Sequence, residues 1–174
     1  MDFHLKGRQA IGTSARMAAL CLVLLVAACG FRLRGQADLP FESVYVQSAS
    51  SSEFATELRR VFEGSNYITL TDAAEQAEVV VKIVEEQQEQ KILSISASGS
   101  VNEFQLLYRV SYRIMNPGME DIVAPDEIRV QRDLTYDDTQ TLGKESEIKL
   151  LFREMRADAV QQLLRRMSVV TTSS

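Results

Sequence analysis

The sequence predicts a two-layer α+β domain, with two helices on one face of a mixed, mostly antiparallel sheet of about four strands. The first observation is an alternation of apolar and polar side chains along residues 103–114, typical of a strand with one buried face. The second is an apolar stripe at helical spacing along residues 144–167. The third is the order of the elements: a strand and a helix come first, several strands joined by turns follow, and a long helix ends the chain.

The first strand and the first helix are expected near the start of this domain. Residues 43–48 alternate around Val44 and Val46, which predicts a strand. Ser50 stands three residues before Glu53, the spacing of a capping box, so we expect Ser50 to cap the helix. Gly64 is expected to end that helix in the left-handed conformation. The apolar face of the helix consists of Phe54, Leu58, Val61 and Phe62.

The middle of the chain predicts mainly strands. A brief strand at residues 67–70 is followed by a polar turn or a single helical turn at residues 72–77. Valine and isoleucine dominate residues 78–84, and residues 87–96 are a candidate continuation of that strand. After the alternating strand, the sequence Asn116-Pro117-Gly118 predicts a turn. A second alternating strand is expected over residues 128–136.

The final helix is expected over residues 144–167. Its apolar face consists of Ile148, Leu151, Phe152, Met155, Ala159, Leu163 and Met167. We expect this face to pack on the domain's own sheet, and a partner-binding face is the alternative. Phe152 lies at the centre of the stripe, so Phe152→Ala is expected to cost about 3 to 5 kcal/mol. The opposite face of the sheet is expected to be polar, with several glutamines and with Arg109, Arg113 and Arg129.

The first 28 residues are typical of a bacterial lipoprotein signal peptide. Three basic residues precede an apolar run over residues 17–26, which at about 10 residues is too short to cross a bilayer. An Ala-Ala pair and Cys29 then match a lipobox, in which the chain is cut before the cysteine and the cysteine is acylated. We expect three acyl chains on Cys29, enough to hold the protein stably at a membrane. An ordinary secretory signal with an incidental cysteine is the alternative.

Removal of this signal peptide leaves little catalytic chemistry. The remaining chain has sixteen Lys and Arg against twenty-three Asp and Glu, one cysteine and no histidine. Histidine-dependent triads and the usual His/Cys zinc sites are therefore excluded, and no phosphate-binding loop motif is present. Adjacent acids such as Asp137 and Asp138 are more typical of a solvated turn than of acid/base catalysis. We expect no enzyme activity, no metal, no cofactor and no nucleic-acid partner.

Three segments carry a resemblance to a known family. They are Cys29-Gly30-Phe31-Arg32-Leu33-Arg34-Gly35 after the lipobox, Glu103-Phe104-Gln105-Leu106 in the long strand, and the final helix from Leu142 to Arg165. Together with the element order, they resemble the LptE family of lipopolysaccharide-assembly lipoproteins of Gram-negative outer membranes. The resemblance implies a plug inside the large LptD β-barrel, which helps that barrel assemble and binds lipopolysaccharide during its transport to the outer leaflet.

The resemblance also implies one ligand contact, at Lys144. This residue matches a basic position of the family at the start of the last helix, and a solvated lysine is the alternative. Its ammonium is expected to meet a phosphate, so Lys144→Asp should weaken lipopolysaccharide binding while stability holds or rises. A second basic position of the family falls near residues 97–99, where this chain has Ala-Ser-Gly. That difference puts a ligand contact by this loop in doubt.

The sequence thus predicts four parts: a signal peptide at 1–28, a lipidated tether at 29–41, a single α+β domain at 42–168 and a frayed tail at 169–174. The expected location is the periplasmic side of the outer membrane, through the anchor at Cys29. Two other functions remain open. A lipid-presenting outer-membrane lipoprotein without a barrel partner predicts a deep apolar pocket. A periplasmic hydrolase that uses only carboxylates requires two acids that converge in a cleft.

Overall fold

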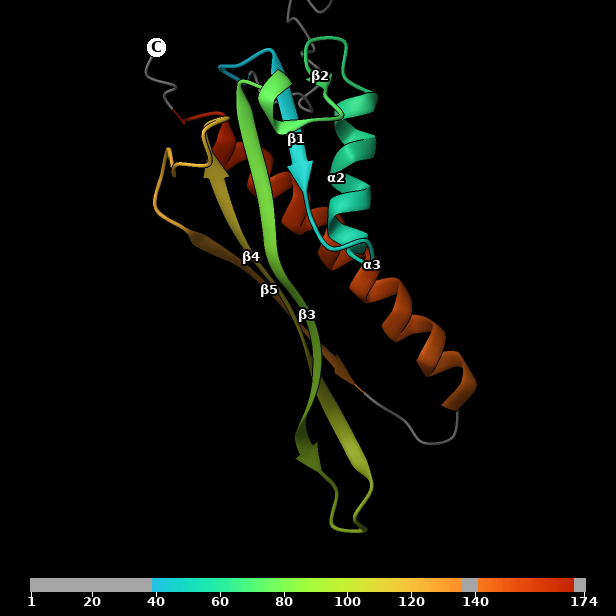
Figure 1. Ribbon diagram of the computed structural model, residues 1–174. Helices are drawn as coiled ribbons and strands as arrows, with labels where there is room; N and C mark the ends of the chain where they lie inside the picture. The colour runs from blue at the N-terminus through green and yellow to red at the C-terminus, as the bar shows by residue number, and fades with distance from the viewer. Residues whose placement is uncertain (1–38, 136–140, 171–174) are drawn as a thin grey trace, which may run out of the picture. The chain divides into compact units, whose positions relative to one another are not determined.

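Two helices lie on one face of a five-stranded sheet in the computed structural model, which describes residues 39–135 and 141–170 (Figure 1). The elements are, in chain order, β1 (Ser43–Gln47), α2 (Glu53–Glu63), β2 (Thr69–Leu70), the short 3-10 helix η1 (Ala74–Gln76), β3 (Val79–Ile95), β4 (Val101–Met115), β5 (Asp126–Thr135) and α3 (Thr141–Met167). The predicted α+β class and two-layer arrangement are confirmed. The sheet has one strand more than the four expected, because the two-residue β2 extends its edge.

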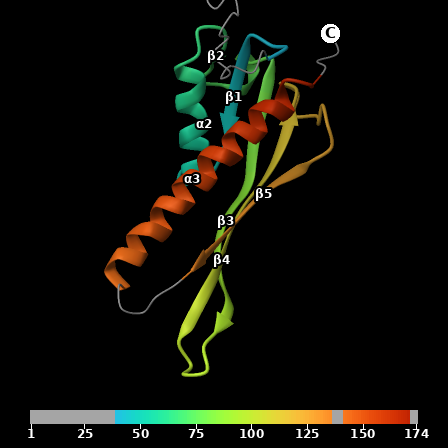
Figure 2. The same ribbon diagram turned by 180° about the vertical axis from the view of Figure 1, so that it is seen from behind.

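The sheet is mixed, as the sequence predicts. Its strand order is β2-β1-β3-β4-β5. The strand β1 is parallel to both β2 and β3, whereas β3, β4 and β5 form an antiparallel meander. Figure 2 shows α3 crossing the sheet diagonally, on the face that α2 also covers. Among the described residues, no helix is long and apolar enough to cross a membrane.

Both ends of α2 differ from the sequence prediction. Ser52, not Ser50, is the N-cap, and its hydroxyl oxygen accepts a hydrogen bond of 3.0 Å from the backbone N–H of Ala55. The helix therefore begins at Glu53, and the predicted capping box is absent. At the other end, Gly64 has a φ of −79° and lies in the right-handed region. Its N–H donates to the carbonyl of Arg60 at 3.0 Å, so the last turn closes without a left-handed residue.

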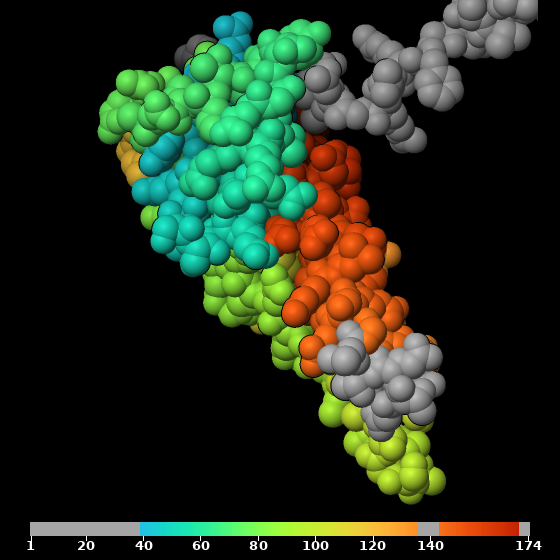
Figure 3. Space-filling model, turned by 90° about the vertical axis from the view of Figure 1, so that its right-hand side faces the viewer, coloured from blue at the N-terminus to red at the C-terminus, as the bar shows by residue number. Residues whose placement is uncertain are grey.

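The strands β3 and β4 form a long hairpin. Residues 78–84 and 87–96 belong to one strand, β3, whose register shifts between Ile83 and Glu85. Val84 is the extra residue of this bulge. Beyond it, β3 and β4 continue past the helices, and Figure 3 shows this hairpin arm (yellow-green) projecting below α2 and α3. The domain therefore has a layered body and a projecting hairpin arm. Because β5 pairs with β4 as far as Glu103, only the tip of this arm is two-stranded.

The core lies between the helices and the inner face of the sheet. The alternation along β4 is confirmed, since Leu106, Tyr108 and Val110 are fully buried. In α3 the fully buried positions are Met155, Ala159, Leu163 and Met167, whereas Phe152 is only partly buried. Phe152 is thus not the centre of the stripe, because the first half of α3 extends beyond α2 (Figures 1 and 2).

The packed part of the domain reaches past the final helix. Val169 is 79% exposed, but the next residue, Val170, is 5% exposed and belongs to the core. Val170 also donates a backbone hydrogen bond to Met167 at 3.2 Å. The core therefore includes a residue that the sequence placed in the frayed tail.

Candidate functional site

The outer face of the sheet is polar, and neither α2 nor α3 lies on it (Figures 1 and 2). Along β4 the side chains that point to this face are Glu103, Gln105, Leu107, Arg109, Ser111 and Arg113. Their cross-strand neighbours on β3 and β5 are mainly Glu, Gln, Arg and Asp. This confirms the polar face predicted from Arg109, Arg113 and Arg129. A sheet with one solvated face needs such side chains, because no second layer shields them.

Many polar groups of this outer face are paired with each other. The Gln105 side-chain amide donates to Asp133 at 3.2 Å, and Arg109 donates to Gln87. Arg113 forms a two-pronged ion pair with Asp121, at 2.8 and 2.6 Å. The face is thus a network of both charge signs that spans β3, β4, β5 and the turn after β4.

These ion pairs shift the pKa values of two carboxyl groups. The hydrogen bonds from Arg113 hold the pKa of Asp121 below its ordinary value. The hydrogen bond from Arg129 lowers the pKa of Glu127 in the same way. Both carboxylates therefore remain ionised well into the acidic range, and the outer face keeps its mixed charges.

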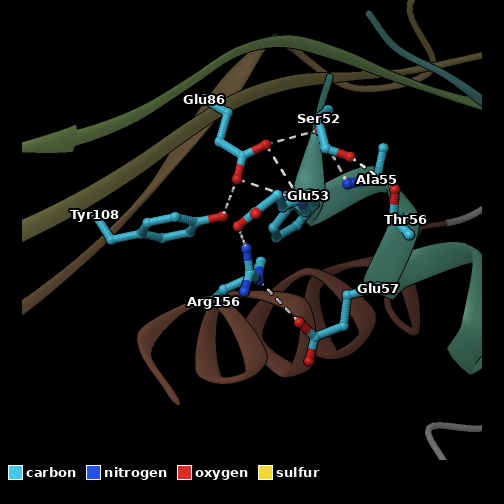
Figure 4. Close-up of polar contacts among 9 residues, drawn as sticks. Ser52, Glu53, Ala55, Thr56, Glu57, Glu86, Tyr108 and Arg156 are labelled. Atoms are coloured by element: carbon cyan, nitrogen blue, oxygen red, sulfur yellow. Dashed lines mark hydrogen bonds and ion pairs between the residues drawn. The ribbon is translucent and has the colours of Figure 1, made fainter. Parts of the chain in front are cut away.

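The inner side of the sheet contains a polar cluster around Glu86 (Figure 4). The Glu86 carboxylate accepts hydrogen bonds from the Tyr108 hydroxyl at 2.6 Å, from the Ser52 hydroxyl at 2.8 Å and from the backbone N–H of Phe54 at 3.2 Å. It thus ties the start of α2 to β3 and β4. A carboxylate at a helix N-terminus is also favoured by the helix dipole.

Burial and charge fix the protonation of this cluster. Burial, together with the hydrogen bond to Glu86, raises the pKa of Tyr108, so its hydroxyl stays protonated and serves as a donor. Beside it, Arg156 of α3 forms ion pairs with Glu53 and Glu57 of α2. Burial raises the pKa of Glu57 and lowers that of Arg156, although both groups favour their charged forms when paired. The cluster therefore joins both helices to the sheet.

The Glu86 cluster was not predicted from the sequence. Its partners come from the start of α2 and from β4, at positions 22 to 34 residues from Glu86 along the chain. One signal was present: two adjacent glutamates interrupt a strand rich in valine and isoleucine. Without the bulge at Val84, however, the alternation puts Glu86 on the wrong face.

A pocket of about 430 Å³ opens beside this cluster, between the start of α2 and β3. Its lining is mostly polar and includes Ser51, Ser52, Glu53, Glu85 and Gln88. Apolar atoms come chiefly from the side chains of Ile83 and Val84. The pocket suits water or a polar group better than an acyl chain.

Lys144 lies in the first turns of α3 and is 20% exposed. Its ammonium donates to the carboxylate of Glu147 at 2.8 Å and to the carbonyl of Thr135, the last residue of β5, at 3.0 Å. The lysine therefore bridges the end of β5 and the start of α3. An anionic ligand at Lys144 must replace or share these two acceptors.

The other predicted site residues do not join Lys144 in one place. The Ala-Ser-Gly loop at residues 97–99 forms the tip of the hairpin arm, where Gly99 has a φ of 89°. Cys29, Asp137 and Asp138 lie outside the described residues. Within residues 39–135 and 141–170, no group of three or more His, Cys, Asp or Glu side chains is arranged to hold a metal ion.

Comparison with known proteins connects this fold to one family. The sequence model of the LptE family, described as lipopolysaccharide-assembly, matches residues 41–167. The LPS-assembly lipoprotein LptE of Yersinia pestis (strain Pestoides F) is 30% identical over 151 residues, which cover 85% of this chain and 72% of the relative.

Solved structures show the same fold. Lipoprotein B from Nitrosomonas europaea is 39% identical, with a TM-score of 0.69, over 80% of this chain and 90% of the other. The rare lipoprotein B from Shewanella oneidensis is 28% identical, with a TM-score of 0.64, over 73% of this chain and 94% of the other. The family match covers both helices and the whole sheet, and on these grounds the chain belongs to the LptE family.

Proposed function

We propose that this chain is an outer-membrane lipoprotein of lipopolysaccharide transport that plugs the LptD β-barrel and helps it assemble. Membership of a lipopolysaccharide-assembly family supports a role in that transport. The main observation that supports a plug is the outer face of the sheet. This face is polar, has mixed charge and is not covered by α2 or α3. The lumen of a membrane β-barrel is polar, so such a face suits contact with its wall.

The plug can be tested by reversing charges on the outer face. Arg109 and Arg129 lie directly opposite each other on β4 and β5, and both point to the outer face. The double variant Arg109→Glu/Arg129→Glu should lower co-purification of LptD with the tagged protein in mild detergent. Arg165→Glu, on an exposed position of α3, is the matched control and should co-purify like the wild type. Equal recovery with all three proteins would mean that the outer face is not the contact surface.

We further propose that the anchor is at Cys29. The chain would be cut before this residue, leaving a tether that runs from Cys29 into the folded domain, whose core includes Phe41 and Val170. The lipobox sequence supports this, and Cys29→Ala should leave a precursor that is neither cleaved nor acylated. Intact-mass spectrometry of the wild type should show an acylated chain that begins at Cys29. A mature chain beginning elsewhere would reject the anchor.

Lys144 is the proposed contact with lipopolysaccharide. Because Glu147 already neutralises its ammonium at 2.8 Å, the proposal makes opposite predictions for the two partners. Lys144→Gln should weaken binding of purified lipopolysaccharide, whereas Glu147→Gln should strengthen it by freeing the lysine. Glu154→Gln, an exposed acid on the same helix, controls for the change in net charge. Should Lys144→Gln leave binding unchanged, the lysine is only a bridge between β5 and α3.

The lipid-presenting alternative is less well supported. It requires a deep apolar cavity, whereas the pocket beside α2 is lined mainly by serine, glutamate and glutamine. The hydrolase alternative requires two available acids in a cleft. Three glutamates line the pocket, but Glu86 is engaged by three donors and Glu53 pairs with Arg156, which leaves Glu85. We therefore propose a protein that acts by binding, without a cofactor. A mild-detergent purification that yields lipid but no barrel would favour the lipid-presenting alternative.

A further inference from the structure

The strand β3 is much longer than the strand beside it. β1 pairs only with residues 79–82 of β3. From Ile83 to Ile95, one edge of β3 has no neighbouring strand within the described part of the chain, while its other edge pairs with β4. An exposed strand edge carries unpaired N–H and C=O groups and readily adds another strand.

Exposed apolar side chains of β3 lie on both sides of residues 85–91. Four large apolar side chains of β3 are about half exposed or more: Val84 58%, Ile92 54%, Leu93 48% and Ile95 59%. Figure 3 shows that neither α2 nor α3 covers the end of the hairpin arm. At the root of the arm, the pocket lined by Val84 and Gln88 leaves room beside the edge. The edge is therefore both unpaired and accessible.

The sequence of the edge is complementary to itself in an antiparallel register centred on Gln88. With Gln88 opposite Gln88 of a second copy, Glu85 faces Lys91 twice, and Gln87 faces Glu89. These four residues share the outer face of the sheet, as their partners on β4 show. A register centred on Gln87 would place Glu85 opposite Glu89 of the second copy. A register centred on Glu89 would place the Glu89 residues of the two copies opposite each other. Like charges directly opposite each other destabilise a strand pair. Centring the pair on Gln90 also opposes Glu89 to Lys91 twice, but a pairing of the same length would then include the register shift at Leu93. The Gln88 register is therefore favoured, because residues 85–91 lie between the irregularities of β3.

We propose that the free chain pairs with a second copy of itself through the β3 edge, antiparallel and two-fold symmetric about Gln88. Pairing over residues 85–91 would join two sheets, with the helices of both copies on the same face. Charge complementarity favours a second copy over an unrelated strand, because each copy supplies both the acid and the base. This self-association is independent of the proposed barrel contact.

Cysteine cross-linking tests the register in the full-length protein, purified in detergent. Gln88→Cys should form a disulfide between copies, since opposed Cα atoms of an antiparallel pair lie about 4.5 to 5.5 Å apart, within disulfide reach. Lys91→Cys alone should not, because its two copies would be about 20 Å apart. An equal mixture of Glu85→Cys and Lys91→Cys should cross-link again. Absence of a Gln88 cross-link, or equal yields at positions 88 and 91, would overturn the proposal.

A charge swap tests the complementarity independently. Glu85→Lys and Lys91→Glu should each lower the Gln88→Cys cross-link yield about threefold or more, because each creates two like-charge pairs. The double variant Glu85→Lys/Lys91→Glu should restore it. Thermal unfolding of each variant confirms that the fold is retained, since both positions are exposed. Failure of the double variant to recover the yield would reject pairing in this register.

Discussion

At the scale of single residues, Glu86 shows how one carboxylate can hold three elements together. It accepts from Ser52, from the Phe54 backbone and from Tyr108, which lie before α2, in α2 and in β4. Each donor is wholly or largely removed from water, so each needs an acceptor inside the protein. The negative charge strengthens all three hydrogen bonds.

Glu86→Ala should therefore lower the free energy of unfolding by about 2 to 4 kcal/mol, because it leaves the Tyr108 hydroxyl and the α2 N-terminus without their acceptor. Chemical denaturation monitored by circular dichroism measures this loss. Glu89→Ala is the control: Glu89 is on the same strand and forms only an exposed ion pair with Lys91, so its loss should change stability by less than about 0.5 kcal/mol. Similar losses in both variants would mean that the cluster is not stabilising.

The Arg113–Asp121 ion pair gives stability a specific pH dependence. The pKa of Asp121 is depressed in the folded state, so its contribution is present above its unfolded pKa and is lost as the pH falls through the folded value. Asp121→Asn should have a melting temperature about 1 to 3 °C below the wild type at pH 6. The two proteins should converge only when the pH falls below the folded-state pKa of Asp121, where this carboxyl group is protonated in both states. A gap that persists at low pH would show that the charge is not responsible.

At the scale of elements, α3 shows that an apolar stripe does not predict how deeply each residue of a helix is buried. The stripe correctly predicts which side of the helix faces the sheet, but not how deeply each position is buried. Burial depends on what lies on the other side, and α2 covers only the second half of α3. Leu163, in the second half of α3, is fully buried, whereas Phe152, in the first half, is only partly buried.

Leu163→Ala should accordingly cost about 2 to 5 kcal/mol of unfolding free energy. Phe152→Ala removes more atoms but should cost less than Leu163→Ala, because part of its ring is already in water. Urea unfolding of both variants under identical conditions compares the two losses directly. The reverse ranking would restore Phe152 as the centre of the helix face.

Local sequence patterns predicted most of the helices and strands. Contacts between residues far apart in the sequence could not be predicted from such patterns. Alternation identified β4, and periodicity identified both helices, because each pattern reflects one buried face. The cap at Ser52 was missed because Ser50 offered a matching spacing nearby. Glu147 and Thr135 as partners of Lys144 were missed because helix position alone does not show what an ammonium meets. The expectation that Lys144→Asp spares stability ignored these two hydrogen bonds.

At the scale of the whole molecule, the domain consists of a layered body and the hairpin arm. The body has helices on one face, whereas β3 and β4 alone form the arm near its tip. Two paired strands without a second layer bury little apolar surface. The end of the arm should therefore contribute little to the stability of the body.

Shortening the arm tests this division. Ile92 and Phe104 are cross-strand partners, so residues 93–103 can be replaced by Asn-Gly, a two-residue hairpin turn. The shortened chain should fold with a melting temperature within about 5 °C of the wild type. Differential scanning calorimetry gives the comparison, and a variant with a scrambled 93–103 sequence controls for composition. Loss of a cooperative transition would mean that the arm is part of the folding unit.

The parallel pairing of β1 with β3 also sets how far this protein can reach. It places the start of β1 beside the start of β3, at the end of the domain opposite the hairpin tip. The seventeen residues of β3 span about 56 Å. With Cys29 acylated as proposed, the roughly 12 residues up to Phe41 add at most about 40 Å. The tip can then reach any point within a half-sphere of about 90 Å radius around the anchor. For a membrane partner inside this volume, the effective concentration of the tip is on the order of 1 mM.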